Sequence, residues 1–218
     1  MTFGRPRPGS LLAVCVGAGK DADWAGRLGR TAIDKHDVGA PVEVSGLGLV
    51  GDEQADLEHH GGVDQALYAY AQQDADHWMQ ALQRDLPPGS FGENLRIDGV
   101  DITGALVGER WQIGDDVEVQ VTAPRIPCTV FSNFLDVPDL VARFLSAGRP
   151  GAYLRVLSTG RIEAGDRVRI LERPDHDVTV ADVLRIRTRD QHEAERLLPL
   201  AALAARPRAW AQGVTADR

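Results

Sequence analysis

Cys128 is the residue whose type and surroundings point most directly to chemistry. It closes the stretch Pro124-Arg125-Ile126-Pro127-Cys128. The two prolines remove backbone donors and stiffen the approach to the thiol. Positive charge from Arg125 favours the thiolate, which is the form that acts as a nucleophile or as a metal ligand. A lone cysteine is also commonly a small buried apolar residue, so both interpretations stay open on this stretch alone.

The other cysteine, Cys15, lies inside the apolar run 11–16, where packing is the better explanation. With two cysteines in 218 residues, neither a disulfide framework nor a four-cysteine zinc site is available. Any metal site must therefore use one thiolate, or histidines and carboxylates.

Two glycines follow the histidine pair His59-His60 in the sequence. Adjacent histidines in extended backbone point to opposite faces, and Gly61 and Gly62 let the backbone come close to a ligand. His60 is therefore the candidate of the pair, although a turn with incidental histidines explains the segment equally well.

Polar groups in two other segments could contact a ligand. Glu93 and Asn94, within Phe91-Gly92-Glu93-Asn94-Leu95, could exchange hydrogen bonds with a polar heterocycle. Lys35 could pair with a phosphate as a point charge. The alternative interpretations are a plain junction between loop and strand and a solvated strand face.

Short strands and Gly-rich turns dominate the chain up to residue 172, a pattern typical of a closed or nearly closed barrel. Gly-Asp turns at 114–115 and 165–166 predict two outer hairpins. Strands are expected over 11–16, 32–38, 42–49, 67–70, 110–113, 117–123, 153–157 and 167–171, and helices over 74–85 and 137–147, the second with Pro138 in its first turn.

The composition changes after residue 172 to Ala, Leu and Arg with helical spacing. We therefore predict a barrel domain over 1–172 and a C-terminal helical domain over 173–218. The first two helical segments of this domain are expected over 179–187 and 190–199, with Thr179 and Asp190 as their N-caps. Further helical turns are expected through residue 211 and should end before Gly213. Such a segment is too short to bury a core alone and should dock on the barrel or on a partner.

The bulk composition excludes several classes of protein. The formal charge of -8 argues against nucleic-acid binding, which needs a dense basic face. No apolar run is long enough for a membrane span, and the first residues lack the apolar core of a signal peptide. A cytoplasmic protein is therefore expected.

The order of the candidate segments along the chain is more informative than any one of them. They are Gly48-x-x-Gly51-Asp52-Glu53-Gln54-Ala55, His60-Gly61-Gly62, Phe91-Gly92-Glu93-Asn94-Leu95, and Pro124-Arg125-x-Pro127-Cys128. This order resembles the MOSC family, the domain named for molybdenum-cofactor sulfurase C-termini, and especially its bacterial stand-alone YiiM-like branch. The resemblance covers residues 10–172, and the tail resembles the three-helix domain of that branch. The implied fold class is mainly β (α+β), a MOSC-type β-barrel with peripheral helices and a small C-terminal three-helix domain.

The resemblance implies binding of the molybdenum cofactor (Mo-molybdopterin), with Cys128 as both metal ligand and catalytic residue. It implies reduction of small N-hydroxylated compounds such as hydroxylaminopurines. The cofactor-binding residues that it suggests are Lys35 and Arg125 for the phosphate, and His60, Gly61, Gly62, Glu93 and Asn94 around the pterin or substrate. Electrons should come from a separate flavoprotein or similar donor, because the Gly-x-Gly strings lack the context of a dinucleotide fingerprint.

Two alternatives use the same thiol. The first is a non-catalytic carrier of molybdenum cofactor, or of sulfur, on Cys128. The second is a metal-free cysteine enzyme with His60 as its base. The helical tail is expected to recruit or orient the redox partner, and the sequence leaves the oligomeric state open.

Overall fold

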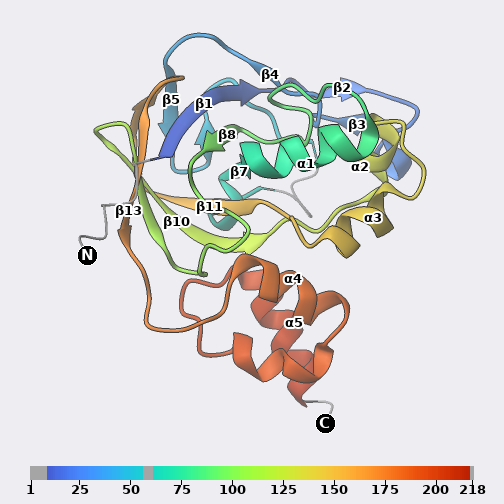
Figure 1. Cartoon of the computed structure of the whole chain (residues 1–218), viewed down its shortest axis with the longest axis vertical. Coiled ribbons are helices and arrows are strands. Elements are labelled where there is room, and N and C mark those ends of the chain that lie inside the picture. Colours follow the sequence, from blue (N-terminus) through green and yellow to red (C-terminus); the bar gives the residue numbers. More distant parts are fainter. Residues whose placement is uncertain (1–8, 56–60, 217–218) are drawn as a thin grey trace.

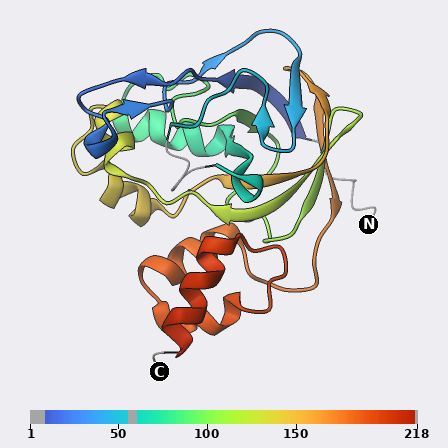
Figure 2. The same cartoon turned by 180° about the vertical axis from the view of Figure 1, so that it is seen from behind.

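The computed structural model of the chain describes residues 9–55 and 61–216. Seven strands of this part close into a barrel (Figures 1 and 2), in the order β13 (Arg167–Glu172), β9 (Arg110–Ile113), β10 (Val117–Pro124), β11 (Ala152–Ser158), β7 (Leu67–Ala71), β8 (Leu95–Asp98) and β1 (Gly9–Val16). Pairing of β1 with β13 closes the ring. The pairs are antiparallel except for β7 with β8. The mainly β fold with helices is confirmed.

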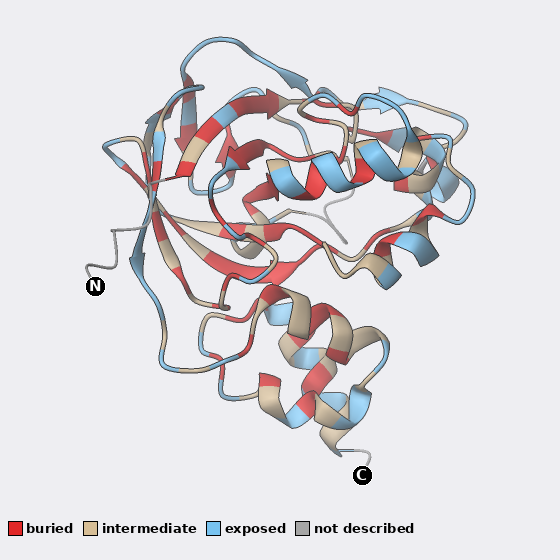
Figure 3. Cartoon of the chain, viewed as in Figure 1, coloured by how far each residue is buried: buried red, intermediate tan, exposed pale blue. Residues whose placement is uncertain are grey.

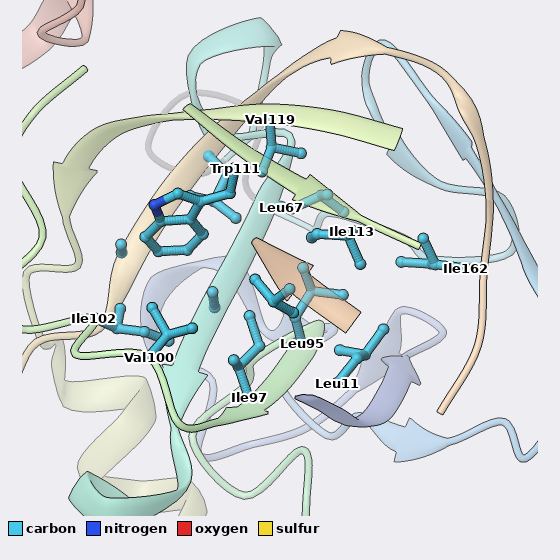
Figure 4. Close-up of a cluster of buried hydrophobic side chains, with 14 of the residues drawn as sticks. Leu11, Leu67, Leu95, Ile97, Val100, Ile102, Trp111, Ile113, Val119 and Ile162 are labelled. Atoms are coloured by element: carbon cyan, nitrogen blue, oxygen red, sulfur yellow. The ribbon is translucent and has the colours of Figure 1, made fainter. Parts of the chain in front are cut away.

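Alternating apolar side chains of the strands fill the barrel. On β10, Val117, Val119 and Val121 are fully buried, whereas Glu118 and Gln120 between them are half-buried. This period of two places one face of the strand inside the barrel. Figure 4 shows the resulting cluster, in which the valines meet buried side chains from the other strands, among them Trp111, Leu67, Leu95, Ile97 and Leu11.

Strand β7 is buried along its whole length because it is covered on both faces. Leu67 and Ala69 face the barrel core, while Tyr68 and Tyr70 join an aromatic cluster outside it. Three helices cover this outer face: α1 (Gln72–Leu82), α2 (Thr129–Phe134) and α3 (Leu140–Ala147). Helix α1 also makes the crossover that parallel pairing of β7 and β8 requires.

Smaller elements surround the upper part of the barrel in Figure 1: β2 (Lys20–Asp21), η1 (Gly26–Leu28), β3 (Arg30–Thr31), β4 (His36–Asp37), β5 (Val42–Ser45), β6 (Gly48–Leu49), η2 (Val63–Gln65) and β12 (Gly160–Ile162). The single strand predicted over 42–49 is a hairpin instead, because Gly48 has a φ of 129° and the Ser45 hydroxyl donates to its carbonyl at 2.9 Å. The strand predicted over 32–38 is reduced to the two residues of β4.

Two other local predictions were wrong. The turn at Gly165 does not make a hairpin, because β12 pairs with β5, whereas β13 pairs with β9 and β1. Helix α3 begins at Leu140, beyond Pro138, because Asp139 adopts a left-handed φ of 64°. Strand β8 and helix α2 have no counterpart among the predicted elements.

The C-terminal helices α4 (Val180–Thr188), η3 (Gln191–Leu197) and α5 (Ala205–Ala216) pack around their own apolar cluster beneath the barrel. Figure 3 shows their buried faces turned toward each other and toward the barrel. Thr179 caps α4 in a capping box with Asp182, as predicted. Helix α5 runs through Gly213, so its predicted end there was wrong.

Hydrogen bonds attach these helices to the barrel, where docking was expected. The backbone N–H of Val180 donates to the Ala105 carbonyl at 2.8 Å, and that of Ala205 to the Asp64 carboxylate at 2.9 Å. The division of the chain into domains at residue 172 stays a prediction. Among the described residues, none of the helices has the length and apolar character needed to cross a membrane.

Candidate functional site

A cavity of about 820 Å³ opens beside the barrel and gathers most of the predicted site residues. One wall comes from the segments 25–35 and 52–55, and a second from the end of β10 and the start of α2, residues 123–130. Tyr68 of β7 and Tyr153 of β11 add aromatic surface, and the C-terminal helices contribute Arg187, Arg206 and Pro207. The volume of the cavity is in the range of pockets that bind cofactors and small molecules.

Cys128 lies on this cavity wall, half-buried and free of disulfide bonding. It occupies the N-cap position of α2 with an extended φ of -126°. Its carbonyl accepts hydrogen bonds from the N–H groups of Phe131 at 3.2 Å and Ser132 at 3.3 Å. The thiol is therefore held between the end of a barrel strand and the first turn of a helix, which agrees with the rigidity expected from the two prolines.

Arg125 places a buried positive charge next to this thiol. Its guanidinium lies 4.2 Å from the ring centroid of Phe131 and donates to the Phe91 carbonyl at 2.7 Å. Burial opposes its charge, but Tyr68, Tyr153 and Cys128 outweigh that effect, so the pKa of Arg125 is raised above its ordinary value. A permanent cation held against aromatic rings thus lies on the same cavity wall as Cys128.

Cys15 differs from Cys128 in burial and lies outside the cavity lining. It is fully buried in β1, and burial, the largest cause, together with Glu93 raises its pKa to about 12. We expect a disulfide reagent to label one thiol in the folded protein and two after unfolding, because only exposed thiolate reacts. Mass spectrometry of the native adduct should locate the label on Cys128, and native labelling that persists in Cys128→Ser would contradict this assignment.

Lys35 and Asn94 both contact the carboxylate of Asp52, which belongs to the motif over residues 48–55. Asp52 forms an ion pair with the Lys35 ammonium and accepts hydrogen bonds from the Asn94 side chain at 2.9 Å and from the N–H of Gly17 at 2.8 Å. Lys35, Asp52 and Asn94 all line the cavity. In the protein alone, the carboxylate of Asp52 neutralises the charge of Lys35 and accepts a hydrogen bond from Asn94. The predicted cofactor contacts of Lys35 and Asn94 stay predictions.

Glu93 lies behind the cavity wall. Its carboxylate is fully buried and accepts from the N–H groups of Gly89 and Phe91, each at 2.9 Å, and from the Nε of Arg96 at 2.8 Å. Arg96 is itself 1% exposed. These bonds fold the loop 87–93 against the barrel, so the position of Glu93 suits support of the wall and not direct contact with a ligand.

Gly89 connects this loop to Lys35. A Cβ atom at residue 89 would come within 2.0 Å of the Lys35 carbonyl oxygen, and its φ is 93°. We expect Gly89→Ala to lower the free energy of unfolding by about 2 kcal/mol or more, through strain and a backbone shift. Gly148→Ala is the matched control, because its φ is 66° and nothing lies near its Cβ position. Denaturant unfolding measures both, and equal losses would contradict the proposed clash.

Of the predicted segment His60-Gly61-Gly62, the structure describes the two glycines. Gly61 lines the cavity with a φ of 96°, and Gly62 follows with a φ of 77° at the start of η2. His60 lies outside the described residues, so its predicted role stays untested. Within the described ranges 9–55 and 61–216, no group of three or more His, Cys, Asp or Glu side chains could hold a metal ion.

Several lining residues were missed by the sequence analysis. Gln65, Tyr68 and Tyr153 come from strands and a short helix that carried no motif, and Arg187 and Arg206 come from the tail. Only the change from alternating to helical spacing after residue 172 marked the tail as distinct, and it gave no sign that two of its arginines reach the barrel cavity.

The described part of the chain is a closed barrel with a thiol and several cations around one cavity beside it. The family model of the MOSC domain matches residues 56–169, and the chain belongs to this family. It is similar to the protein YflK of Bacillus subtilis, with 32% identity over 89% of each chain. A protein of Gibberella moniliformis named a reductase is 34% identical over 83% of this chain, which covers 32% of that protein. The crystal structure of YiiM from Geobacillus stearothermophilus superposes with a TM-score of 0.80 at 26% identity, covering 95% of this chain and 99% of that one.

Proposed function

We propose that this protein is a molybdenum-cofactor-dependent reductase of N-hydroxylated compounds. The observation that carries the proposal is the half-buried thiol of Cys128 on the wall of a large cavity, next to the fixed cation of Arg125. Membership of the MOSC family associates the fold with the molybdenum cofactor. The name of the fungal relative, a reductase, supports a redox reaction.

The donor groups around the cavity fit this cofactor. A single soft thiolate suits a molybdenum centre whose other ligands belong to an organic cofactor. The buried Oε1 of Gln65 has no hydrogen-bond partner in the described structure and could accept from a pterin N–H. Cys128 would hold the metal, Gln65 and Asn94 the pterin, and Lys35 and Arg125 are the predicted phosphate contacts.

The reaction consumes two electrons and two protons per N–O bond, and converts N–OH to N–H and water. When bound, the cofactor supplies the two electrons. Arg125 supplies a fixed positive charge beside the thiol side chain, and burial raises the pKa of Tyr153, so that Tyr153 lines the cavity as a protonated phenol. A separate redox protein, such as a flavoprotein, is proposed to resupply the electrons.

The experiment that tests this function uses protein purified from a host that makes molybdenum cofactor. With a chemical reductant, it should convert a hydroxylaminopurine to the corresponding amine and contain stoichiometric molybdenum by elemental analysis. A molybdenum-loaded protein without turnover would instead establish a carrier of the cofactor. Full activity without any metal would establish a metal-free cysteine enzyme.

A further inference from the structure

The segment between β1 and β4 forms a hairpin of its own on one wall of the cavity. Within the described residues, β2 and β3 pair with each other in a two-stranded sheet that is separate from the barrel. The turn between them includes η1 and places Ala25, Gly26 and Arg27 on the cavity wall. Residues 20–31, called the β2–β3 hairpin below, therefore cover one side of the space that Cys128 also lines.

Hydrogen bonds within the β2–β3 hairpin hold it together as one unit. Besides the pairing of the strands, the N–H of Ala22 donates to the Gly29 carbonyl at 2.9 Å, and that of Ala25 to the Ala22 carbonyl at 2.9 Å. The N–H of Gly29 donates to the Gly26 carbonyl at 3.2 Å. All of these bonds join residues of the hairpin to one another, so they persist if the whole hairpin moves relative to the barrel.

Exposed polar contacts attach the base of the β2–β3 hairpin to neighbouring segments. Lys20 forms an ion pair with Asp34, and Arg30 pairs with Glu53 at 3.7 Å. The N–H of Gly19 donates to the Glu53 carboxylate at 2.7 Å. The side chains of Lys20 and Arg30 are 48% and 50% exposed, and ion pairs in such positions contribute little because water screens them. The base can therefore act as a hinge.

The tip of the β2–β3 hairpin makes an apolar contact with helix α2. The ring of Trp24 lies 5.9 Å from that of Phe134 between centroids, and the Nδ2 of Asn133 donates to the Trp24 carbonyl at 2.9 Å. Both partners belong to α2, whose N-cap is Cys128. Trp24 and Phe134 are half-buried, so their contact removes apolar surface from water. Trp24 therefore links two walls of the cavity, which lie side by side in Figures 1 and 2.

We propose that the β2–β3 hairpin is a lid on the cavity, and that Trp24 is the latch that holds it closed against α2. Release of Trp24 from Phe134 lets the hairpin turn about its base as one unit, which opens the cavity to a ligand at Cys128. Such a lid excludes water from the thiol while it is closed and admits the ligand when it opens. The lid rests on the contacts of the hairpin and not on the proposed reaction.

The labelling kinetics of Cys128 in the full chain test the lid. We expect Trp24→Ala to raise the rate of labelling by a bulky aromatic disulfide about tenfold, because loss of the aromatic pair increases the open population. The rate with the small reagent methyl methanethiosulfonate should rise less, because a small reagent needs less opening. Asp23→Ala is the matched control, since Asp23 is exposed beside Trp24 in the same turn, and it should leave both rates unchanged.

Cys15 reports unfolding in the same experiment, because it is fully buried in β1 and is labelled when the barrel unfolds. Faster labelling of Cys128 with Cys15 still unlabelled supports the lid, whereas an unchanged rate at Cys128 would overturn it. If Trp24→Ala unfolds and Cys15 is labelled as well, Asn133→Ala decides. Asn133 is exposed, and its replacement removes the hydrogen bond to Trp24. A smaller rise at Cys128 is expected there, and no rise would overturn the lid.

Discussion

Replacement of Cys128 by serine should remove molybdenum from the purified protein and lower kcat/KM for a hydroxylaminopurine by roughly a thousandfold, which corresponds to about 4 kcal/mol of transition-state stabilisation. The hydroxyl of serine has nearly the shape of the thiol but is a hard, protonated oxygen at neutral pH, so it is a poor ligand for a metal that prefers thiolate. Elemental analysis and reductant-driven turnover, measured on the same preparation, check both effects.

Cys15→Ser is the matched control for this prediction, since Cys15 is buried in β1 with a pKa raised to about 12 by burial and does not line the cavity. It should retain both metal and turnover, with at most a modest loss of stability. If Cys128→Ser retained its molybdenum and its activity, the thiol would not be the metal ligand.

Replacement of Arg96 by methionine should lower the free energy of unfolding by about 3–5 kcal/mol. The side chain of Arg96 is 1% exposed and that of its partner Glu93 is 0% exposed, so the substitution leaves a carboxylate in the protein interior without its cation. Urea unfolding followed by circular dichroism measures the loss, and a lower molybdenum content should accompany it, because the loop 87–93 supports the cavity wall.

Arg110→Met provides the comparison for Arg96→Met. Arg110 pairs with Glu118 and Glu172 at the barrel surface, where its side chain is 39% exposed. Exposed pairs contribute at most about 1 kcal/mol. Equal losses of stability in the two variants would show that burial of the Glu93–Arg96 pair has no special importance.

The sequence predicted most strands of the barrel, because the patterns that indicate a strand involve residues close together in the chain. Alternating valines on β10 and the Gly-Asp turn before them depend on neighbouring residues, and both appear in the structure. Strand β8 was missed, because its burial depends on pairing with β7 and β1, which are distant in the chain. Local patterns do not report such pairings.

The sequence predicted which residues belong to the candidate site better than it predicted the contacts that these residues make. Lys35, Asn94, Arg125, Gly61 and Cys128 all line one cavity. That Glu93 instead pairs with Arg96 behind the wall could not be read from the sequence, because both partners of a buried ion pair look like solvent-exposed charges in a linear pattern. The contribution of the tail depends on how α4 and α5 dock, which is a property of the whole fold.

Closure of the barrel by its first and last strands has a consequence for biosynthesis. Because Gly9 and Ser10 of β1 pair with Val168 and Arg167 of β13, the ring cannot close on the ribosome until this part of β13 has left the exit tunnel. Until then β1 presents an unpaired edge that invites aggregation, and closure must wait for a contact of very long sequence separation. The cavity, which residues of α4 and α5 help to line, is therefore complete only when these helices have also docked.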